Sequence, residues 1–282
     1  MVLDAEEIAK CMAMYEVDPQ EQINKTRFRS MFVEKWGVSC GAKILEVGCG
    51  QGETTAVLAE AVGANGYVVA TDPASYNYGS PITVGESANF LSRSRLGSRI
   101  SFHFNSKISD DELPFLDRTF DYVVLAHCSY YFENKKDLFN TFISAKKWTK
   151  TLCFSEWDTL VSSINQVSHL LAILIQGQVE VFKEKSIANI RSPFSRQEVE
   201  RLLGNSGWLI THASTVNALQ SQEDVFWEVD VCLKHLITEV DSLKLPEKLY
   251  DLIRWEIDAL EMQKKACPVE PLLSYCLIAK LE

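Results

Sequence analysis

The sequence lacks the features that mark several large classes of protein. It has no extended run of Lys or Arg, and its longest purely apolar run, LLAILI at 170–175, is far too short to span a bilayer. No linker rich in Gly, Ser and Pro divides it, and no internal repeat is visible. Its eight cysteines include no C-x-x-C pair, so we expect reduced thiols and neither a zinc site nor a disulfide framework.

The composition is that of a globular protein with an acidic surface. The 282 residues are 46% hydrophobic, which is enough for one full core. The formal net charge of −10 gives a diffuse acidic field that repels nucleic acids and anionic membranes. The N-terminus, MVLDAEEIAK, is acidic where a signal peptide would be basic and then apolar. We therefore expect a cytoplasmic protein with no nucleic-acid partner and no membrane partner.

Strand-like and helix-like segments alternate through the first half of the chain. The strand-like segments are KILEV (43–47), YVVAT (67–71), RISFHF (99–104), DYVVLAH (121–127) and TLCFSE (151–156). Helical patterns follow the first, second and fourth of these. Such alternation predicts an α/β fold with a parallel sheet and helices on both of its faces.

Further helices flank this alternating region. The segment 17–36 predicts a helix with Asp18 as its N-cap, and 195–204 predicts one with Ser195 as its N-cap. Between 159 and 192, Leu160, Ile164 and Leu174 have helical spacing, together with Val167 and Leu171, which predicts a helix that interrupts the sheet pattern. Two more amphipathic helices are expected within 220–266, and a last strand at 272–282.

The stretch LEVGCGQG at 45–52 carries the sharpest chemical signal. Glycines after a buried strand let the backbone approach a ligand closely. A dinucleotide fingerprint G-x-G-x-x-G would need a third glycine at Glu53 or Thr55, and Glu46 and Glu53 would repel a diphosphate. Asp72, at the end of the second strand, is placed to accept ribose hydroxyls. A nucleoside with positive charge and no diphosphate describes S-adenosyl-L-methionine.

LEVGCGQG, VVATD and FDYVVLAH together resemble the class I S-adenosylmethionine-dependent methyltransferases of the small-molecule type. The resemblance implies a Rossmann-like, seven-stranded, mostly parallel sheet whose last strand is antiparallel, with helical insertions that cap the substrate. It also implies which residues bind the cofactor: Glu46, Gly48, Cys49, Gly50 and Gly52 at the methionine moiety, Asp72 and the adjoining Pro73 at the ribose, Asn105 or Ser106 at the adenine, and Ala126 and His127 at the sulfonium.

The resemblance also suggests how one domain, 1–282, is divided. Residues 1–40 would form a helical lid, in which Arg27 and Tyr15 are candidate partners of the methionine carboxylate. Residues 41–158 would form the cofactor-binding core, and 159–192 and 220–266 the helical cap.

His127, His169 and Tyr131 are the candidate catalytic residues. Imidazole titrates near neutral pH, and His127 ends the fourth strand. Each histidine is equally compatible with a purely structural role. A metal-assisted mechanism would need an Asp at the end of the fourth strand and an Asp-Asn pair after the fifth, where the chain has His127 and EWD. We therefore expect no metal.

The function predicted is O-, N- or C-methylation of a small organic metabolite, and natural-product biosynthesis is its expected setting. The alternatives are a cyclase or isomerase that binds the cofactor without transferring methyl, a binding or regulatory module, and a protein or nucleic-acid methyltransferase. The sequence HCSY after the fourth strand, in place of Asn/Asp-Pro-Pro-Tyr, disfavours a nucleic-acid base as substrate. Either a monomer or a homodimer is compatible with the sequence.

Overall fold

The computed structural model describes residues 3–108, 116–184, 186, 188–217 and 222–282. Within them lies a seven-stranded sheet of order β3-β2-β1-β4-β5-β7-β6. The strands are β1 (Lys43–Val47), β2 (Tyr67–Asp72), β3 (Ile100–Phe104), β4 (Tyr122–Ala126), β5 (Thr151–Trp157), β6 (Leu209–Val216) and β7 (Ser274–Lys280). Strands β1 to β5 pair in parallel, and β7 is antiparallel to both β5 and β6. The predicted fold class is confirmed.

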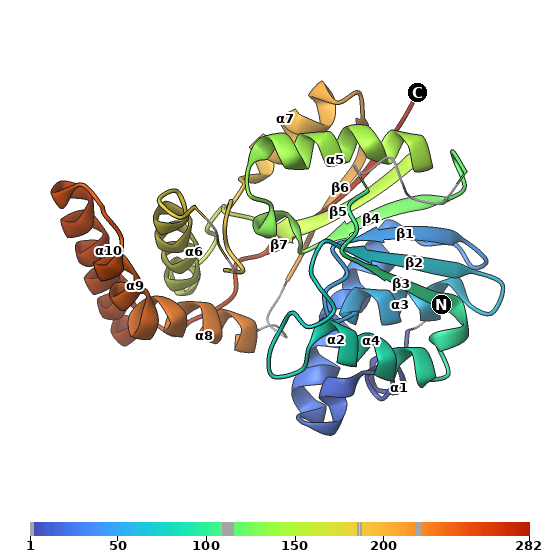
Figure 1. The fold of residues 1–282 in the computed structure, drawn as a ribbon, viewed down its shortest axis with the longest axis horizontal. Helices are drawn as coiled ribbons and strands as arrows, with labels where there is room; N and C mark the ends of the chain where they lie inside the picture. The colour runs from blue at the N-terminus through green and yellow to red at the C-terminus, as the bar shows by residue number, and fades with distance from the viewer. Residues whose placement is uncertain (1–2, 109–115, 185, 187, 218–221) are drawn as a thin grey trace.

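Helices cover both faces of the sheet (Figure 1). One face carries α1 (Ala5–Ala9), η1 (Ala13–Glu16), α2 (Pro19–Trp36), α3 (Glu53–Val62) and α4 (Val84–Arg93); the other carries α5 (Lys135–Trp148) and α7 (Arg196–Asn205). Two short helices, η2 (Gly97–Arg99) and η3 (Ser129–Tyr131), adjoin β3 and β4.

Alternation along each strand supplies both faces with apolar side chains. Ile44 and Val68 belong to the buried cluster beneath α2 and α3, and Leu45 and Val69 belong to the cluster beneath α5 and α7. Strands buried on both faces read as continuous apolar runs, which explains the sequence pattern.

Local signals fix the helix ends as predicted. The Asp18 carboxylate accepts the backbone N–H of Glu21 at 3.0 Å, and the Ser195 hydroxyl accepts that of Glu198 at 3.3 Å. Each bond satisfies a donor that has no partner inside the helix.

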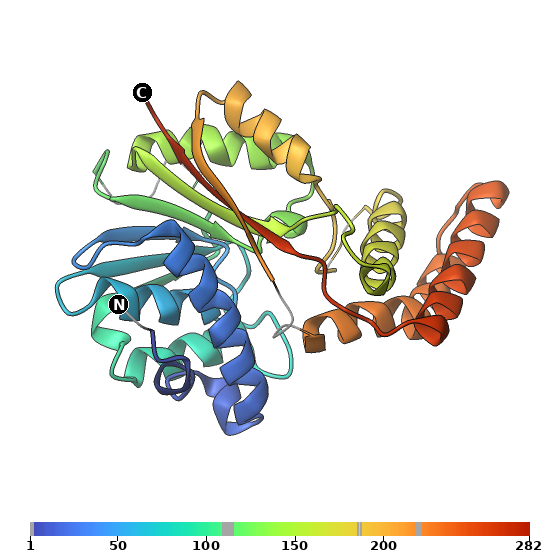
Figure 2. The same ribbon diagram turned by 180° about the vertical axis from the view of Figure 1, so that it is seen from behind.

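The remaining helices form a lobe beside the sheet, at the edge where β5 and β6 end and β7 begins (Figures 1 and 2). This helical lobe contains η4 (Ile164–Gln166), α6 (Val167–Glu180), α8 (Gln222–Val231), the π-helical turn η6 (Cys232–Leu236), α9 (Ile237–Ser242) and α10 (Glu247–Ala266). It has an apolar cluster of its own, which includes Ile175, Val229 and Leu260. No helix in the described part of the chain has both the length and the apolar character needed to cross a membrane.

The helix expected from the apolar spacing at 160–174 begins later than predicted. Leu160 precedes it, and the helical turns start at η4 and α6. Leu160, Ile164 and Leu174 are 69%, 61% and 41% exposed. Helix α6 buries a mixed face instead: Ser168, His169, Ala172, Ile173, Ile175, Gln176 and Val179.

This orientation of α6 predicts unequal effects at two adjacent positions. Ile175→Ala should lower the free energy of unfolding by about 2–5 kcal/mol, because it leaves a cavity in the lobe. Leu174→Ala should cost under about 1 kcal/mol, because its side chain is already 41% exposed. Urea denaturation of both variants measures the difference. Equal losses would show that the helix is oriented otherwise.

Candidate functional site

The glycine loop connects β1 to α3 at the carboxyl edge of the sheet. The Gly48 N–H donates to the Thr71 carbonyl at 2.8 Å, and a Cβ at Gly48 would lie 2.6 Å from the Cβ of Cys128. At Gly50, by contrast, φ is +51° and a Cβ would meet no atom within 4 Å. Gly48 is therefore required for packing, whereas Gly50 presents bare backbone on its open side. Cys49 is buried, and Gly52 caps α3.

Asp72 joins this loop to the end of β2. Its Oδ2 accepts the Gly50 N–H at 2.8 Å, and its Oδ1 accepts the Ala74 N–H at 2.8 Å. The carboxylate is thus fixed at the neighbouring strand end, where ligands of α/β sheets bind. Its oxygens keep further lone pairs for a ligand hydroxyl.

Glu46 lies beneath the same loop and is 1% exposed. Its Oε2 accepts the Thr55 hydroxyl at 2.5 Å. Burial raises the pKa of Glu46 from its ordinary value to about 8, and the nearby Glu53 and Asp72 charges add to the shift against an opposing effect of Arg29. A buried acid of this kind favours a cationic group beside it.

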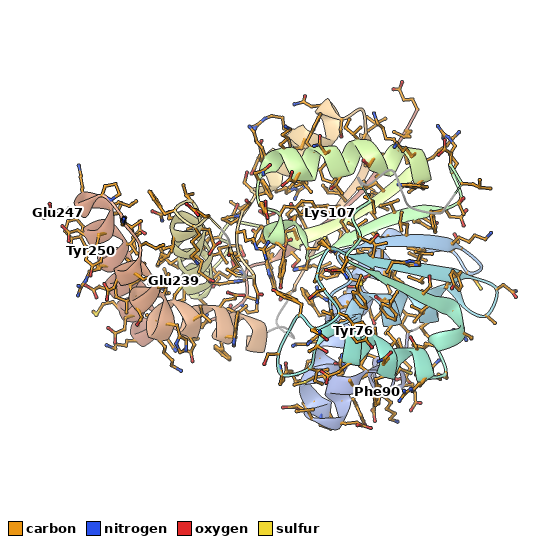
Figure 3. All side chains as sticks on the ribbon, in the orientation of Figure 1. Tyr76, Phe90, Lys107, Glu239, Glu247 and Tyr250 are labelled. Carbon is orange, nitrogen blue, oxygen red and sulfur yellow. The ribbon has the colours of Figure 1, made fainter. Side chains whose placement is uncertain are left out.

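The candidates at the end of β3 adjoin Asp72. Asn105 has φ 54° and donates its N–H to the Ala74 carbonyl, and Ser106 donates its N–H to the Asp72 carbonyl, both at 3.0 Å. Pro73 and Asn105 are exposed. Tyr76, labelled in Figure 3, packs edge-on against Phe104 with ring centroids 5.9 Å apart. The region offers polar backbone and aromatic faces together.

Ala126 is buried at the end of β4, and His127 follows it with φ 50°. The His127 Nδ1 is 3.4 Å from Glu156 Oε1, and its Nε2 is 3.2 Å from the Ser274 hydroxyl. Burial lowers the pKa of His127 well below its usual value, with smaller contributions from Arg29 and His169. His127 is therefore a neutral ring whose two nitrogens both face protein groups.

Aromatic rings enclose His127. The centroids of Phe32, Phe28 and Trp157 lie 5.0, 5.2 and 4.7 Å from its own. Helix α2 supplies the two phenylalanines, so this helix contributes to the wall around His127.

Glu156 is a further buried carboxyl group of the edge, at 2% exposure. It accepts the N–H and the hydroxyl of Ser129, at 3.0 and 2.8 Å, and the N–H of Trp157 at 3.0 Å. Burial raises its pKa, although these hydrogen bonds oppose the shift. Glu156 thereby ties the turn after β4 to the end of β5.

His169, from α6, reaches the same place from the lobe. Its Nδ1 accepts the Leu272 N–H at 3.0 Å, and its ring lies edge-on to Trp157 at 5.0 Å. The bond leaves its proton on Nε2. Tyr131, the third catalytic candidate, is 42% exposed in η3.

Arg29 is the site residue that sequence reasoning missed. Its Nη1 is buried and has no hydrogen-bond partner among the described residues. The guanidinium carbon lies 5.3 Å from the ring centroid of Phe28 and 6.0 Å from that of Phe32. The predicted Arg27 is exposed on the same helix, and Tyr15 is half-buried in η1. Helix phase was the available signal, because Thr26, Phe32 and Val33, neighbours of Arg29 at three and four residues, are all buried.

Two surface hollows formed by described residues lie away from this site. They are shallow, of about 280 and 370 Å³, and lie around Asp121 and around His212, at the amino edge of β1 and β4 and beside β6. Neither borders the glycine loop. The site is therefore located by the polar groups that converge at the carboxyl edge of the sheet, and not by the shape of the surface. Within the described residues, no group of three or more His, Cys, Asp or Glu side chains is arranged to hold a metal.

The order of the strands, the glycine loop and the carboxylates of Glu46 and Asp72 on β1 and β2 define the class I methyltransferase fold. The chain matches the family model described as "Methyltransferase domain" over residues 24–213, more than half of its length. The protein belongs to this family, as the sequence motifs indicated. Membership implies S-adenosyl-L-methionine as the cofactor.

Individual relatives extend the comparison. A crystal structure of a cyclopropane-fatty-acyl-phospholipid synthase-like protein from Lactobacillus casei ATCC 334 is 30% identical and covers 98% of both chains, with a TM-score of 0.85. The methyltransferase phomM' of Diaporthe leptostromiformis is 31% identical over 153 residues, which are 48% of this chain and 40% of that protein. The match thus covers less than half of that curated relative. The [4+2]-cyclase SpnF shares the fold alone, at 13% identity and a TM-score of 0.55.

The raised pKa of Glu46 predicts a pH-dependent effect of Glu46→Gln on stability. Between about pH 4.5 and pH 8 the native protein holds a proton at Glu46 that the unfolded chain has lost, so wild-type stability falls as pH rises. The stability of Glu46→Gln relative to wild type should therefore increase across this window, by at most about 1.4 kcal/mol per pH unit, and then level off. Urea denaturation from pH 5 to pH 9 measures it. A constant difference would show that Glu46 ionises normally.

Proposed function

We propose that this protein transfers a methyl group from S-adenosyl-L-methionine to a small organic molecule. The observation that carries the proposal is the convergence of Asp72, Glu46 and the half-buried Arg29, whose Nη1 is buried without a partner among the described residues, around an open glycine backbone. These groups match a ribose, an ammonium and a carboxylate in turn. The family membership of the chain supports the same cofactor.

The residues fit the cofactor as follows. Asp72 would accept the ribose hydroxyls, and Pro73 with Asn105 or Ser106 would border the adenine. Gly48, Cys49, Gly50 and Gly52 would carry the backbone along the amino-acid part, whose ammonium would lie toward Glu46 and whose carboxylate would lie toward Arg29. Ala126 and His127 would border the sulfonium.

When bound, the cofactor supplies a methyl group that is already activated for displacement. The protein then needs chiefly to align the acceptor and exclude water. His127, held by Glu156 and Ser274, would form a fixed wall of the reaction site. His127, His169 and Tyr131 stay candidates for accepting a proton from an oxygen nucleophile; an amine or carbon nucleophile needs positioning alone.

The substrate is proposed from the lobe. Tyr130, Ile173, Ile190 and Leu272 form a buried apolar cluster where the lobe meets the sheet. Segments 159–192 and 220–266 would thus cap an apolar, small-molecule substrate, with 1–40 as a lid on the cofactor side.

A second candidate is methylene transfer to the double bond of an acyl chain. The name of the Lactobacillus casei protein, similar over 98% of both chains, favours it. A cofactor labelled with a trideuterated methyl group distinguishes the reactions by product mass. Methyl transfer keeps all three deuterium atoms, methylene transfer keeps two, and a cyclisation without transfer keeps none and forms no S-adenosylhomocysteine.

Asp72→Asn tests the ribose site. Cofactor affinity should fall about tenfold or more, because an amide offers one acceptor where a carboxylate offers two. Asp121→Asn is the matched control: the Asp121 carboxylate also accepts a backbone N–H, from Lys43 at 2.8 Å, but at the amino edge of the sheet. Calorimetric titration should show unchanged affinity in the control. Unchanged affinity in Asp72→Asn would place the ribose elsewhere.

Arg29→Ala tests the carboxylate partner. Affinity for S-adenosylhomocysteine should fall about tenfold or more, because a charge-assisted hydrogen bond is lost. Affinity for 5′-methylthioadenosine, which has no carboxylate, should hardly change. Arg27→Ala, on the exposed side of the same helix, serves as the control. If Arg29→Ala weakens both ligands equally, its role is structural.

A further inference from the structure

Helix α10 has two apolar faces. One faces inward, where Ile253 and Leu260 are fully buried in the cluster of the helical lobe. The other faces solvent and consists of exposed residues, which we name the apolar stripe: Leu252, Trp255, Ala259, Met262 and Ala266. Leu252, Trp255 and Met262 are 41%, 63% and 65% exposed.

The other sides of α10 are already in use. Glu256 accepts a hydrogen bond from Gln178 at 3.0 Å, and Gln263 donates to the Ile164 carbonyl at 3.1 Å, so one flank lies against α6 and η4. Lys264 lies 2.7 Å from Asp230 of α8. Figures 1 and 2 show α10 as the outermost element of the lobe. Among the described residues, then, none of this chain covers the apolar stripe.

The stripe has the spacing of a coiled-coil seam. Its members follow one another at intervals of three, four, three and four residues. This is the a/d repeat by which one helix packs against another along its length. A solvated helix needs no such repeat.

We propose that the apolar stripe is a dimer interface on which α10 of a second copy of this chain packs antiparallel. The size of the side chains favours this arrangement. One two-fold register sets Leu252 opposite the partner's Met262 and Trp255 opposite the partner's Ala259. By symmetry, Met262 then lies opposite the partner's Leu252, and Ala259 opposite the partner's Trp255. A large residue then fills the space left by a small one at both central layers. In a parallel pair, Trp255 would meet its own copy.

Charge favours the same register. The open flank of the stripe carries Asp251, Asp258 and Lys265. Antiparallel packing brings Asp251 beside the partner's Lys265, and this pair occurs twice. Lys265 also pairs with Glu261 of its own helix at 2.7 Å, and an ammonium has donors for both. Asp258 meets its own copy at the axis and is the repulsive pair of this flank; on the opposite flank Glu256, which accepts a hydrogen bond from Gln178, also faces its own copy.

Sedimentation equilibrium of the full chain tests the interface. Wild type should be dimeric, and Trp255→Glu should raise the dimer dissociation constant about tenfold or more. Trp227→Glu is the matched control, since Trp227 is 54% exposed on α8, outside the stripe. The Trp227→Glu variant should stay dimeric. The melting temperature of each variant reports whether that variant is folded. A monomeric wild type, or a Trp255→Glu variant that is folded and still dimeric, would overturn the proposal.

Charge exchange tests the register. Asp251→Lys and Lys265→Asp should each weaken the dimer, and the double variant should restore it, because both ion pairs re-form with reversed sign. Asp258→Asn should tighten it by removing the repulsion at the axis. Failure of the double variant to recover would rule out antiparallel packing in this register.

Discussion

Buried charge at the carboxyl edge of the sheet is the constraint on which the site depends. Glu46 and Glu156 are 1% and 2% exposed, and both have raised pKa values because burial disfavours their charged forms. Arg29 is the half-buried cation near them, and its buried Nη1 lacks a partner within the described chain. A ligand that carries one ammonium and one carboxylate would give the buried carboxyl groups a cation and would give Arg29 a hydrogen-bond acceptor. Burial thus makes it costly to keep Glu46 and Glu156 charged without a cation beside them.

The hydrogen bonds at the ends of the strands limit which catalytic roles the two histidines can have. The two ring nitrogens of His127 face Glu156 and Ser274, and aromatic rings pack around it. A ring held on both sides orients its surroundings well but has little freedom to approach a substrate proton. His169 likewise commits Nδ1 to the Leu272 N–H. The arrangement therefore favours catalysis by alignment, which suits an electrophile that is activated before it binds.

Much of the fold was predictable because its signals are local. Strands β1 to β5 read as apolar runs, since both of their faces are buried, and Asp18 and Ser195 capped their helices through bonds to residues three positions on. Gly50 and Asp72 were recognisable because the loop needs bare backbone and a fixed acid. Arg29 was missed for the opposite reason. Its importance arises from Glu46 and His127, which are distant in sequence, and the one local signal that separates it from Arg27 is the helix phase set by the buried Thr26, Phe32 and Val33.

Helix α6 shows why the remainder escaped prediction, and the failure is itself informative. Apolar periodicity finds the buried face of a helix only when that face is apolar. Here Ser168, His169 and Gln176 are buried, and the Ser168 hydroxyl has no partner among the described residues. These polar groups are buried for different reasons. The His169 ring lies against Trp157 of β5 and accepts the Leu272 N–H, whereas Gln176 donates to Glu228 of α8 inside the lobe. On the outer side of α6 Leu174 is 41% exposed, and the exposed apolar stripe lies on neighbouring α10. In this lobe an apolar pattern therefore does not identify the buried side of a helix, because hydrogen-bonded polar residues are buried and apolar residues remain on the surface.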